Sequence, residues 1–360
     1  MPTFSLEEVK KHNHVKDLWV INQNKVYDVT TFVEKHPGGK EVLAEFAGSN
    51  VTEIMREPSS HNFGHKHTKY AYSLLQSHYI GDLEKGGQRN HTDGVHRRQT
   101  HEEKKSTEET DVPQPNFEEN ITEDTLIDWN KPILWQVGSL GDKYMDWVHK
   151  PVDRKIRLFR SNFCEMCGNA YWWTVPSFWV PVILLLLYSS YQNGQSTGPD
   201  WLGISPVVML PVYFALGILS WTFIEYVVHR WLFHLTPPAN SKFLITMHFL
   251  YHGQHHKSPF DKKRLVFPIV PALPLALTIY LGYCAIFPIH VAQAYMAGTI
   301  SGYMGYDLTH YYLHHGTPSL QYFRNLKRYH VRHHFEDIAK GFGISSKLWD
   351  YPFGTLIQDN

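Results

Sequence analysis

Ten histidines in the second half of the chain recur at short, regular spacings. They form four motifs: His229-x4-His234, His252-x2-His255-His256, His310-x3-His314 and His330-x2-His333-His334. Residues at i, i+3 and i+4 share one helix face, so each His-x-x-His-His motif is expected to point its three rings one way. The step from His229 to His234 does not fit one face, and we expect a helix end or a distortion between them.

This pattern indicates a metal centre. Imidazole is the commonest protein ligand for redox-capable first-row metals. Ten ligands are too many for one ion and suit two, so the sequence predicts a dimetal site. Two further histidines of the region, His248 and His315, lie outside the pattern, and we expect them to pack beside the ligands.

Long apolar runs in the same half of the chain predict helices that cross a membrane. Tyr171–Tyr191 and Leu202–Ile224 contain no charged residue and have spanning length, and 265–306 is long enough for two more spans. We therefore expect four transmembrane helices, at about 171–191, 202–224, 265–286 and 288–308.

Lysine and arginine flank these runs on one side only. They precede the first run, separate the second from the third and follow the fourth, whereas the connections 190–201 and 288–291 contain none. Positive charge marks the cytosolic side of a membrane protein. Both termini and all four histidine motifs are therefore predicted to be cytosolic, with His290 on the luminal side.

Charge, cysteine content and the first residues of the chain bear on its partners and its compartment. The chain has 34 basic and 34 acidic residues, so a nucleic-acid partner has no electrostatic support. Three cysteines fit a reducing compartment better than a disulfide scaffold. The polar opening of the chain does not have the pattern of a signal peptide.

The first 84 residues are typical of a small soluble domain. Ser5-x-x-Glu8 predicts a capped helix, and the apolar runs Leu18–Ile21 and Val26–Val29 predict strands around a turn. His36-Pro37-Gly38-Gly39 then leads into a predicted helix over Glu41–Phe46. Glycines after a histidine let the backbone approach a bulky planar group.

Aromatic and glycine residues surround that motif: Trp19, Tyr27, Ala47-Gly48 and Tyr79-Ile80-Gly81. With them, residues 3–84 resemble a cytochrome b5 domain. The resemblance implies a haem b with two axial histidines, the first being His36. Counting back from Gly81 favours His67 as the second, and spacing from His36 leaves His61 as the alternative. A haem with both axial positions filled carries electrons.

Residues 85–120 are polar and poor in apolar side chains, and they predict a flexible linker. The sequence thus predicts a multidomain protein. A small α+β haem domain at 1–84 is followed by the linker and by an all-α membrane domain at 121–360. That domain combines four transmembrane helices with a cytosolic, histidine-rich helical cap.

The histidine spacing resembles the membrane fatty acid hydroxylase and sterol desaturase superfamily. Further motifs narrow the resemblance to fatty acid 2-hydroxylases: 128–132 (DWNKP), 134–138 (LWQVG), 147–152 (WVHKPV), Glu225-Tyr226, Asp307-Leu308-x-His310 and Gly341-Phe342-Gly343. The resemblance implies O2-dependent hydroxylation at C2 of a long fatty acyl chain destined for, or already within, ceramide. It also implies the endoplasmic reticulum membrane and electrons from NADPH through a cytochrome b5 reductase-type donor.

The resemblance assigns all ten histidines as ligands of two metal ions. We expect iron, because zinc has no redox chemistry, although imidazole ligands also accept zinc in a purified sample. Glu225 and Asp307 are candidates to accept the outer ring N–H of a ligand. Two alternatives stay open, namely a sterol desaturase or methyl oxidase, and a membrane-anchored cytochrome b5 electron carrier.

Overall fold

The computed structural model describes residues 2–36, 39–56, 67, 69–84, 126–152, 154–199 and 203–358. They belong to two units, one within residues 1–36 and 40–122 and the other within 37–39 and 123–360. The predicted linker at 85–120 lies outside the described residues.

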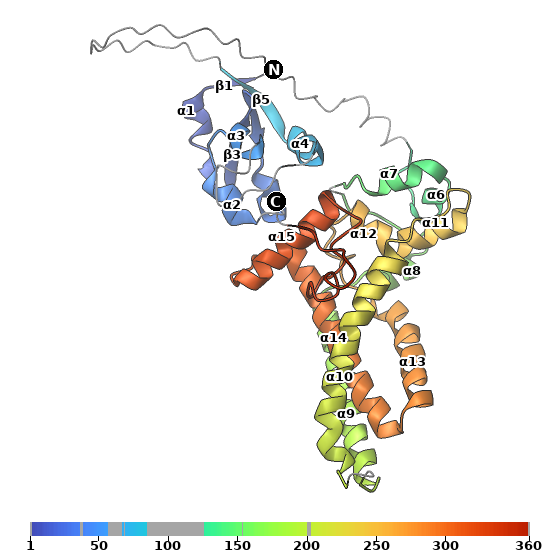
Figure 1. The fold of residues 1–360 in the computed structure, drawn as a ribbon. Helices are drawn as coiled ribbons and strands as arrows, with labels where there is room; N and C mark the ends of the chain where they lie inside the picture. The colour runs from blue at the N-terminus through green and yellow to red at the C-terminus, as the bar shows by residue number, and fades with distance from the viewer. Residues whose placement is uncertain are drawn as a thin grey trace. The chain divides into compact units, whose positions relative to one another are not determined.

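A five-stranded sheet organises the first unit (Figure 1). Its strands lie in the order β1 (Thr3–Phe4), β5 (Tyr79–Leu83), β4 (Lys25–Asp28), β3 (Asp17–Asn22) and β2 (Asn13–His14). Only the β1–β5 pair is parallel. The β3–β4 hairpin turns at Gln23 and Asn24, both with positive φ, as a tight hairpin turn requires. Both predicted strands are confirmed.

Short helices complete this unit: α1 (Leu6–Val9), η1 (Thr30–Lys35), α2 (Lys40–Glu45), α3 (Thr52–Arg56) and α4 (Lys69–Gln76). Ser5 caps α1, its hydroxyl accepting the Glu8 N–H at 3.2 Å, so the predicted cap is confirmed. The predicted helix over 41–46 is confirmed as α2. A core cluster comprises Leu18, Val20, Tyr27, Val29, Val33, Val51 and Met55.

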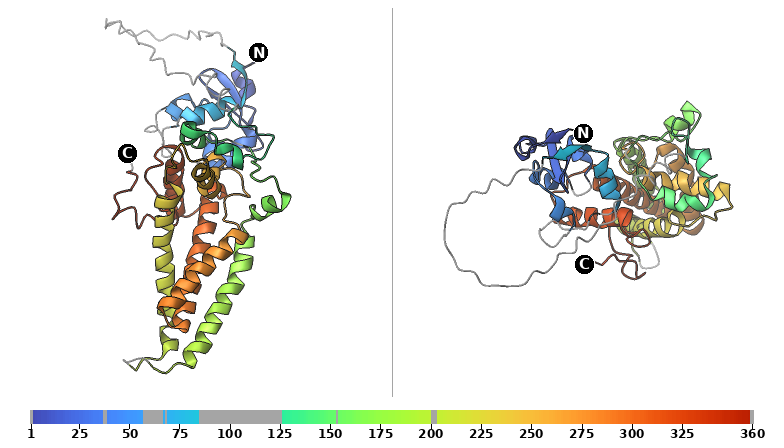
Figure 2. Two further views of the ribbon diagram at one scale, coloured as in Figure 1. Left: turned by 90° about the vertical axis from the view of Figure 1, so that its right-hand side faces the viewer. Right: turned by 90° about the horizontal axis from the view of Figure 1, so that it is seen from above.

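Long helices dominate the second unit (Figure 2). They are α9 (Thr174–Gln195), α10 (Pro206–Val227), α13 (Ile269–Ile286) and α14 (Ile289–His315). Among the described residues, three segments are long and apolar enough to cross a membrane, namely Thr174–Gln195, Pro206–Phe233 and Ile269–Ile286. They overlap three of the four predicted spans, with ends that differ by up to nine residues, and the bounds of the spans stay a prediction.

Helix α14 contacts α9, α10 and α13. It crosses α10 so closely that a Cβ added to Gly217 would lie 2.1 Å from the Tyr295 carbonyl oxygen, and one added to Gly298 would lie 2.0 Å from that of Phe214. Because neighbouring helices surround it, α14 buries polar residues such as His290 and Gln293. It is not among the three apolar segments, and the span at 288–308 stays a prediction.

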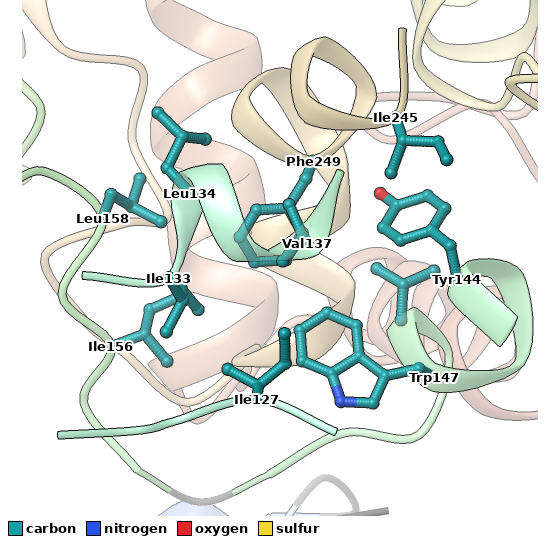
Figure 3. Close-up of a cluster of buried hydrophobic side chains, with 11 residues drawn as sticks. Ile127, Ile133, Leu134, Val137, Tyr144, Trp147, Ile156, Leu158, Ile245 and Phe249 are labelled. Atoms are coloured by element: carbon teal, nitrogen blue, oxygen red, sulfur yellow. The ribbon is translucent and has the colours of Figure 1, made fainter. Parts of the chain in front are cut away.

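Shorter helices make up the rest of the second unit. They are α6 (Leu134–Val137), η3 (Gly141–Lys143), α7 (Tyr144–Val148), α8 (Asn162–Cys167), the π-helix η4 (Val228–Phe233), α11 (Lys242–His248), the π-helix η5 (Phe249–Gly253), α12 (Gln254–Lys257) and α15 (Gln321–Phe335). An apolar cluster joins the segment 127–158 to Ile245 of α11 and Phe249 of η5 (Figure 3). This packing fastens the segment before the first span to the helices that carry histidines.

Trp147 is the largest side chain of this cluster and is 1% exposed. We expect Trp147→Ala to lower the stability of the second unit by about 3–5 kcal/mol, because it leaves a cavity. Thermal unfolding in detergent would measure the loss. Trp135→Ala is the matched control, since Trp135 is 68% exposed. Equal effects of the two substitutions would contradict the packing described here.

Candidate dimetal centre

Two of the histidine motifs lie in or beside π-helical turns, which are wider than the turns of an α-helix. His229 belongs to the π-helix η4, and His234 ends that helix as its C-cap. The predicted distortion between the two is therefore confirmed. His252 lies in the second π-helix, η5, and His255 and His256 follow on α12. π-turns of this kind are frequent at functional sites.

The remaining ligand candidates lie near the C-terminal ends of two helices. Helix α14 carries His310 and His314, and α15 carries His330, His333 and His334. All ten predicted ligands are thus placed by η4, η5, α12, α14 and α15.

Nine of the ten rings form two groups rather than one. The four-histidine group comprises His229, His234, His252 and His333, and the five-histidine group comprises His255, His310, His314, His330 and His334. Within each group the ligand nitrogens lie within 4.8 Å of one another. Each His-x-x-His-His motif contributes to both groups, so its three rings do not serve one ion, as a single shared face would suggest.

His256 lies between the groups. Its Nε2 is 3.0 Å from Nε2 of His252, and its ring centre is 4.3 Å from that of His334. Sequence spacing alone could not assign this ring to either group.

In the four-histidine group, Nε2 of His234 lies close to Nε2 of each of the other three rings. Nε2 of His234 lies 3.2 Å from Nε2 of His229, 3.1 Å from that of His252 and 3.0 Å from that of His333. Nδ1 of His229 donates to the Phe342 carbonyl at 2.6 Å. Nδ1 of His333 donates to the Lys340 carbonyl, also at 2.6 Å.

A carbonyl can only accept a hydrogen bond, so these two rings carry their hydrogen on Nδ1 and a lone pair on Nε2. His234 has at most one Nε2 hydrogen to share among its three neighbours. At least two of the contacts therefore lack a hydrogen bond, and when Nε2 of His234 carries no hydrogen its lone pair faces those of His229 and His333. A cation at this point removes the repulsion, and nitrogens bound to one ion at about 2.0–2.1 Å lie at such separations from one another.

The five-histidine group has the same geometry. Nε2 of His255 lies 2.9 Å from that of His334 and 3.0 Å from that of His310. Nε2 of His330 lies 2.8 Å from that of His314 and 3.1 Å from that of His334. The donor sets of both groups fit one metal ion each.

Burial keeps these rings neutral, which is the form that binds metal. It lowers the pKa of His333 to about 4. Burial first, and repulsion between neighbouring rings second, lower the pKa of His252, His255, His256 and His334 well below the ordinary value of 6.5.

The expected roles of two carboxylates are wrong. Glu225 accepts the N–H groups of Ile344 and Ser345 at 3.0 and 2.8 Å, not a ligand ring. Asp307 accepts the Phe267 N–H at 3.1 Å. Both hold backbone segments, because backbone groups already bond the ligand rings beside them, Phe342 bonding His229 and Leu265 bonding His310.

Lys257 is a residue of the centre that sequence reasoning missed. It follows His256 directly, is 3% exposed, and donates to the carbonyls of Trp147 at 2.7 Å and Lys150 at 2.6 Å. Its ammonium also lies 4.3 Å from the Trp147 ring centre. In the sequence it is only one of the positive charges that flank the predicted spans, and its spacing does not predict this burial.

His248 and His315 lie beside the ligands, as expected. His248 Nδ1 lies 2.6 Å from the Tyr144 hydroxyl, and His315 packs against Tyr311. Neither belongs to the two groups.

The first unit offers a candidate haem site around His36. This half-buried histidine follows η1, and Phe32 approaches its ring edge-on at 5.9 Å. Gly39 has φ 98°, which a residue with a side chain rarely adopts. Partly buried Leu43, Phe46 and Leu75 line the neighbouring core, and such apolar walls fit a flat ring system.

The second axial position is less completely described. His67 is half-buried, whereas His61 lies outside the described residues. The assignment of His67 stays a prediction.

Comparison with known proteins agrees with both sites. A model described as cytochrome b5-like heme/steroid binding domain matches residues 5–84, and one described as fatty acid hydroxylase matches 214–355. The protein is thus a membrane hydroxylase with a fused cytochrome b5 domain.

Curated relatives cover nearly the whole chain. A fatty acid 2-hydroxylase from Rattus norvegicus is 41% identical over 99% of this chain and 96% of its own length. A ceramide very long chain fatty acid hydroxylase from Saccharomyces cerevisiae is 34% identical over 98% of this chain and 94% of its own. The chain belongs to the fatty acid 2-hydroxylase family.

A solved structure supports the fold of the second unit. Full-length scs7p, of which only the hydroxylase domain is visible, matches with a TM-score of 0.59 and 33% identity, over 68% of this chain and 90% of that one.

We predict that His333→Ala removes one of two non-haem metal ions per chain, because it takes a ligand from the four-histidine group. Elemental analysis of the purified chain, corrected for haem iron, measures this. His315→Ala is the matched control, since it removes a neighbouring imidazole that belongs to neither group. Equal metal content in both variants would remove His333 from the ligand set.

Proposed function

We propose that this enzyme hydroxylates C2 of long fatty acyl chains destined for 2-hydroxy sphingolipids. The observation that carries the proposal is the meeting of nine largely buried imidazoles in two groups, with His256 between them, in a chain that also has a cytochrome b5 domain. Relatives named for ceramide and dihydroceramide fatty acyl hydroxylation support a sphingolipid substrate.

Iron held by the ten histidines would supply oxygen activation, and haem b held by His36 and His67 would supply single electrons. The protein contributes the surroundings. Neutral rings leave the ligand lone pairs free, and the carbonyls of Phe342 and Lys340 orient His229 and His333. Full burial of His333 excludes bulk water.

Four further parts belong to the proposal. We propose the domains 1–84, 85–120 and 121–360. From the family resemblance we place the enzyme in the endoplasmic reticulum membrane, and both termini are cytosolic because lysine and arginine flank the spans on one side. Electrons come from NADPH through a cytochrome b5 reductase-type partner. O2 is the co-substrate.

Lipid mass spectrometry tests the reaction. Cells without endogenous activity should gain 2-hydroxy sphingolipids when they express the chain, and should gain none with His252→Ala. If 2-hydroxy sphingolipids rise with neither chain despite a normal haem spectrum, sterols are the next substrates to test. Sterols are the substrates that the alternative function, a sterol desaturase or methyl oxidase, would use. A rise with both would remove the histidine groups from the reaction.

The electron route has its own test. We expect His36→Ala to abolish the Soret band of the haem while the second unit stays folded and keeps its non-haem metal, because the units have separate cores. A normal bis-histidine spectrum in this variant would contradict the haem assignment.

A further inference from the structure

The C-terminal segment, residues 341–355, is tied to the metal centre by buried carboxylates. Asp350 is 0% exposed. Its Oδ1 accepts the N–H of Phe342 at 3.0 Å, and its Oδ2 accepts the N–H of Gly343, also at 3.0 Å. The Thr355 hydroxyl donates to Oδ1 at 2.7 Å. These donors offset the cost of removing this carboxylate from water.

Glu225 of α10 binds the next two backbone N–H groups of the segment in the same way. Its Oε1 accepts the N–H groups of Ile344 and Ser345, and its Oε2 accepts the Ser345 hydroxyl at 2.5 Å. Asp350 and Glu225 together bind four successive backbone N–H groups, 342–345. Backbone held in this way has little freedom to shift.

The carbonyl of Phe342 lies within this fixed stretch and accepts Nδ1–H of His229 at 2.6 Å. The Phe342 ring also packs on two other ligands, with ring centres 5.3 Å from His234 and 5.7 Å from His333. The carboxylates therefore act on the four-histidine group through residue 342.

The five-histidine group is oriented differently. Among the described residues, the buried Nδ1 atoms of His255, His330 and His334 have no hydrogen-bond partner. Packing sets the direction of these rings. A change in the C-terminal segment should therefore affect the two groups unequally.

We propose that Asp350 is a positioning residue for the metal ion of the four-histidine group. The inference rests on the proposed function, since it requires the dimetal centre. By fixing the N–H groups of Phe342 and Gly343, Asp350 holds the Phe342 carbonyl on His229 and so directs Nε2 of His229 toward the ion. Loss of such an outer partner typically costs about 10–100-fold in metal affinity.

Asp350→Asn tests this with little change of size. The amide has one acceptor oxygen, so one of the two N–H groups loses its partner. Non-haem metal per chain is measured on the full-length protein in detergent, during titration with a chelator. We expect one of the two ions to bind about 10–100-fold more weakly. The other ion and the haem content should be unchanged.

Asp142→Asn is the matched control, because Asp142 is exposed on η3. Retention of both ions at wild-type affinity by Asp350→Asn would overturn the proposal, and so would equal weakening of both. Should that variant fail to fold, Asp350→Glu decides, since it keeps the charge but displaces the carboxylate from the N–H groups of Phe342 and Gly343. Selective weakening there supports the proposal, and wild-type retention overturns it. A wild-type chain without non-haem metal would instead refute the dimetal centre itself.

Discussion

Close contact between ring nitrogens that have too few hydrogens to share is the constraint on which the histidine centre of the second unit depends. Nε2 of His234 faces three other Nε2 atoms at 3.0–3.2 Å, and two of those rings have their hydrogen fixed on the opposite nitrogen. Such an arrangement is costly without a cation and favourable with one. Metal binding and the folding of this region are therefore linked.

The surrounding fold holds these rings from three directions. Helices α10 and α14 cross at Gly217 and Gly298, and they lead to His229 and His310. The segment before the first span is fastened beside His256 through Lys257. The C-terminal segment supplies the carbonyl that orients His229. Parts of the chain more than 100 residues apart thus set one centre.

Much of this could be predicted from local sequence. The spacing of the histidines predicted helices for the motifs that contain them. The five-residue step from His229 to His234 predicted the distortion that is observed as η4. The length of the apolar runs predicted the three segments that the structure shows as candidate spans. These signals act over a few residues, so a single sequence displays them.

Long-range contacts could not be predicted in the same way. The division of nine of the ten rings into two groups depends on how η5, α12 and α15 meet, and it splits each His-x-x-His-His motif. Glu225 and Asp307 have suitable spacing from their histidines, but other backbone donors occupy them. Lys257, like Arg264, looked like a flanking charge until its burial was visible.

Anomalous X-ray scattering from crystals of the full chain tests the dimetal centre most directly. Data collected at the iron and zinc absorption edges locate the ions independently of any activity. Two peaks outside the haem are expected, one within the four-histidine group and one within the five-histidine group. A single peak, or metal bound away from these rings, would contradict the account.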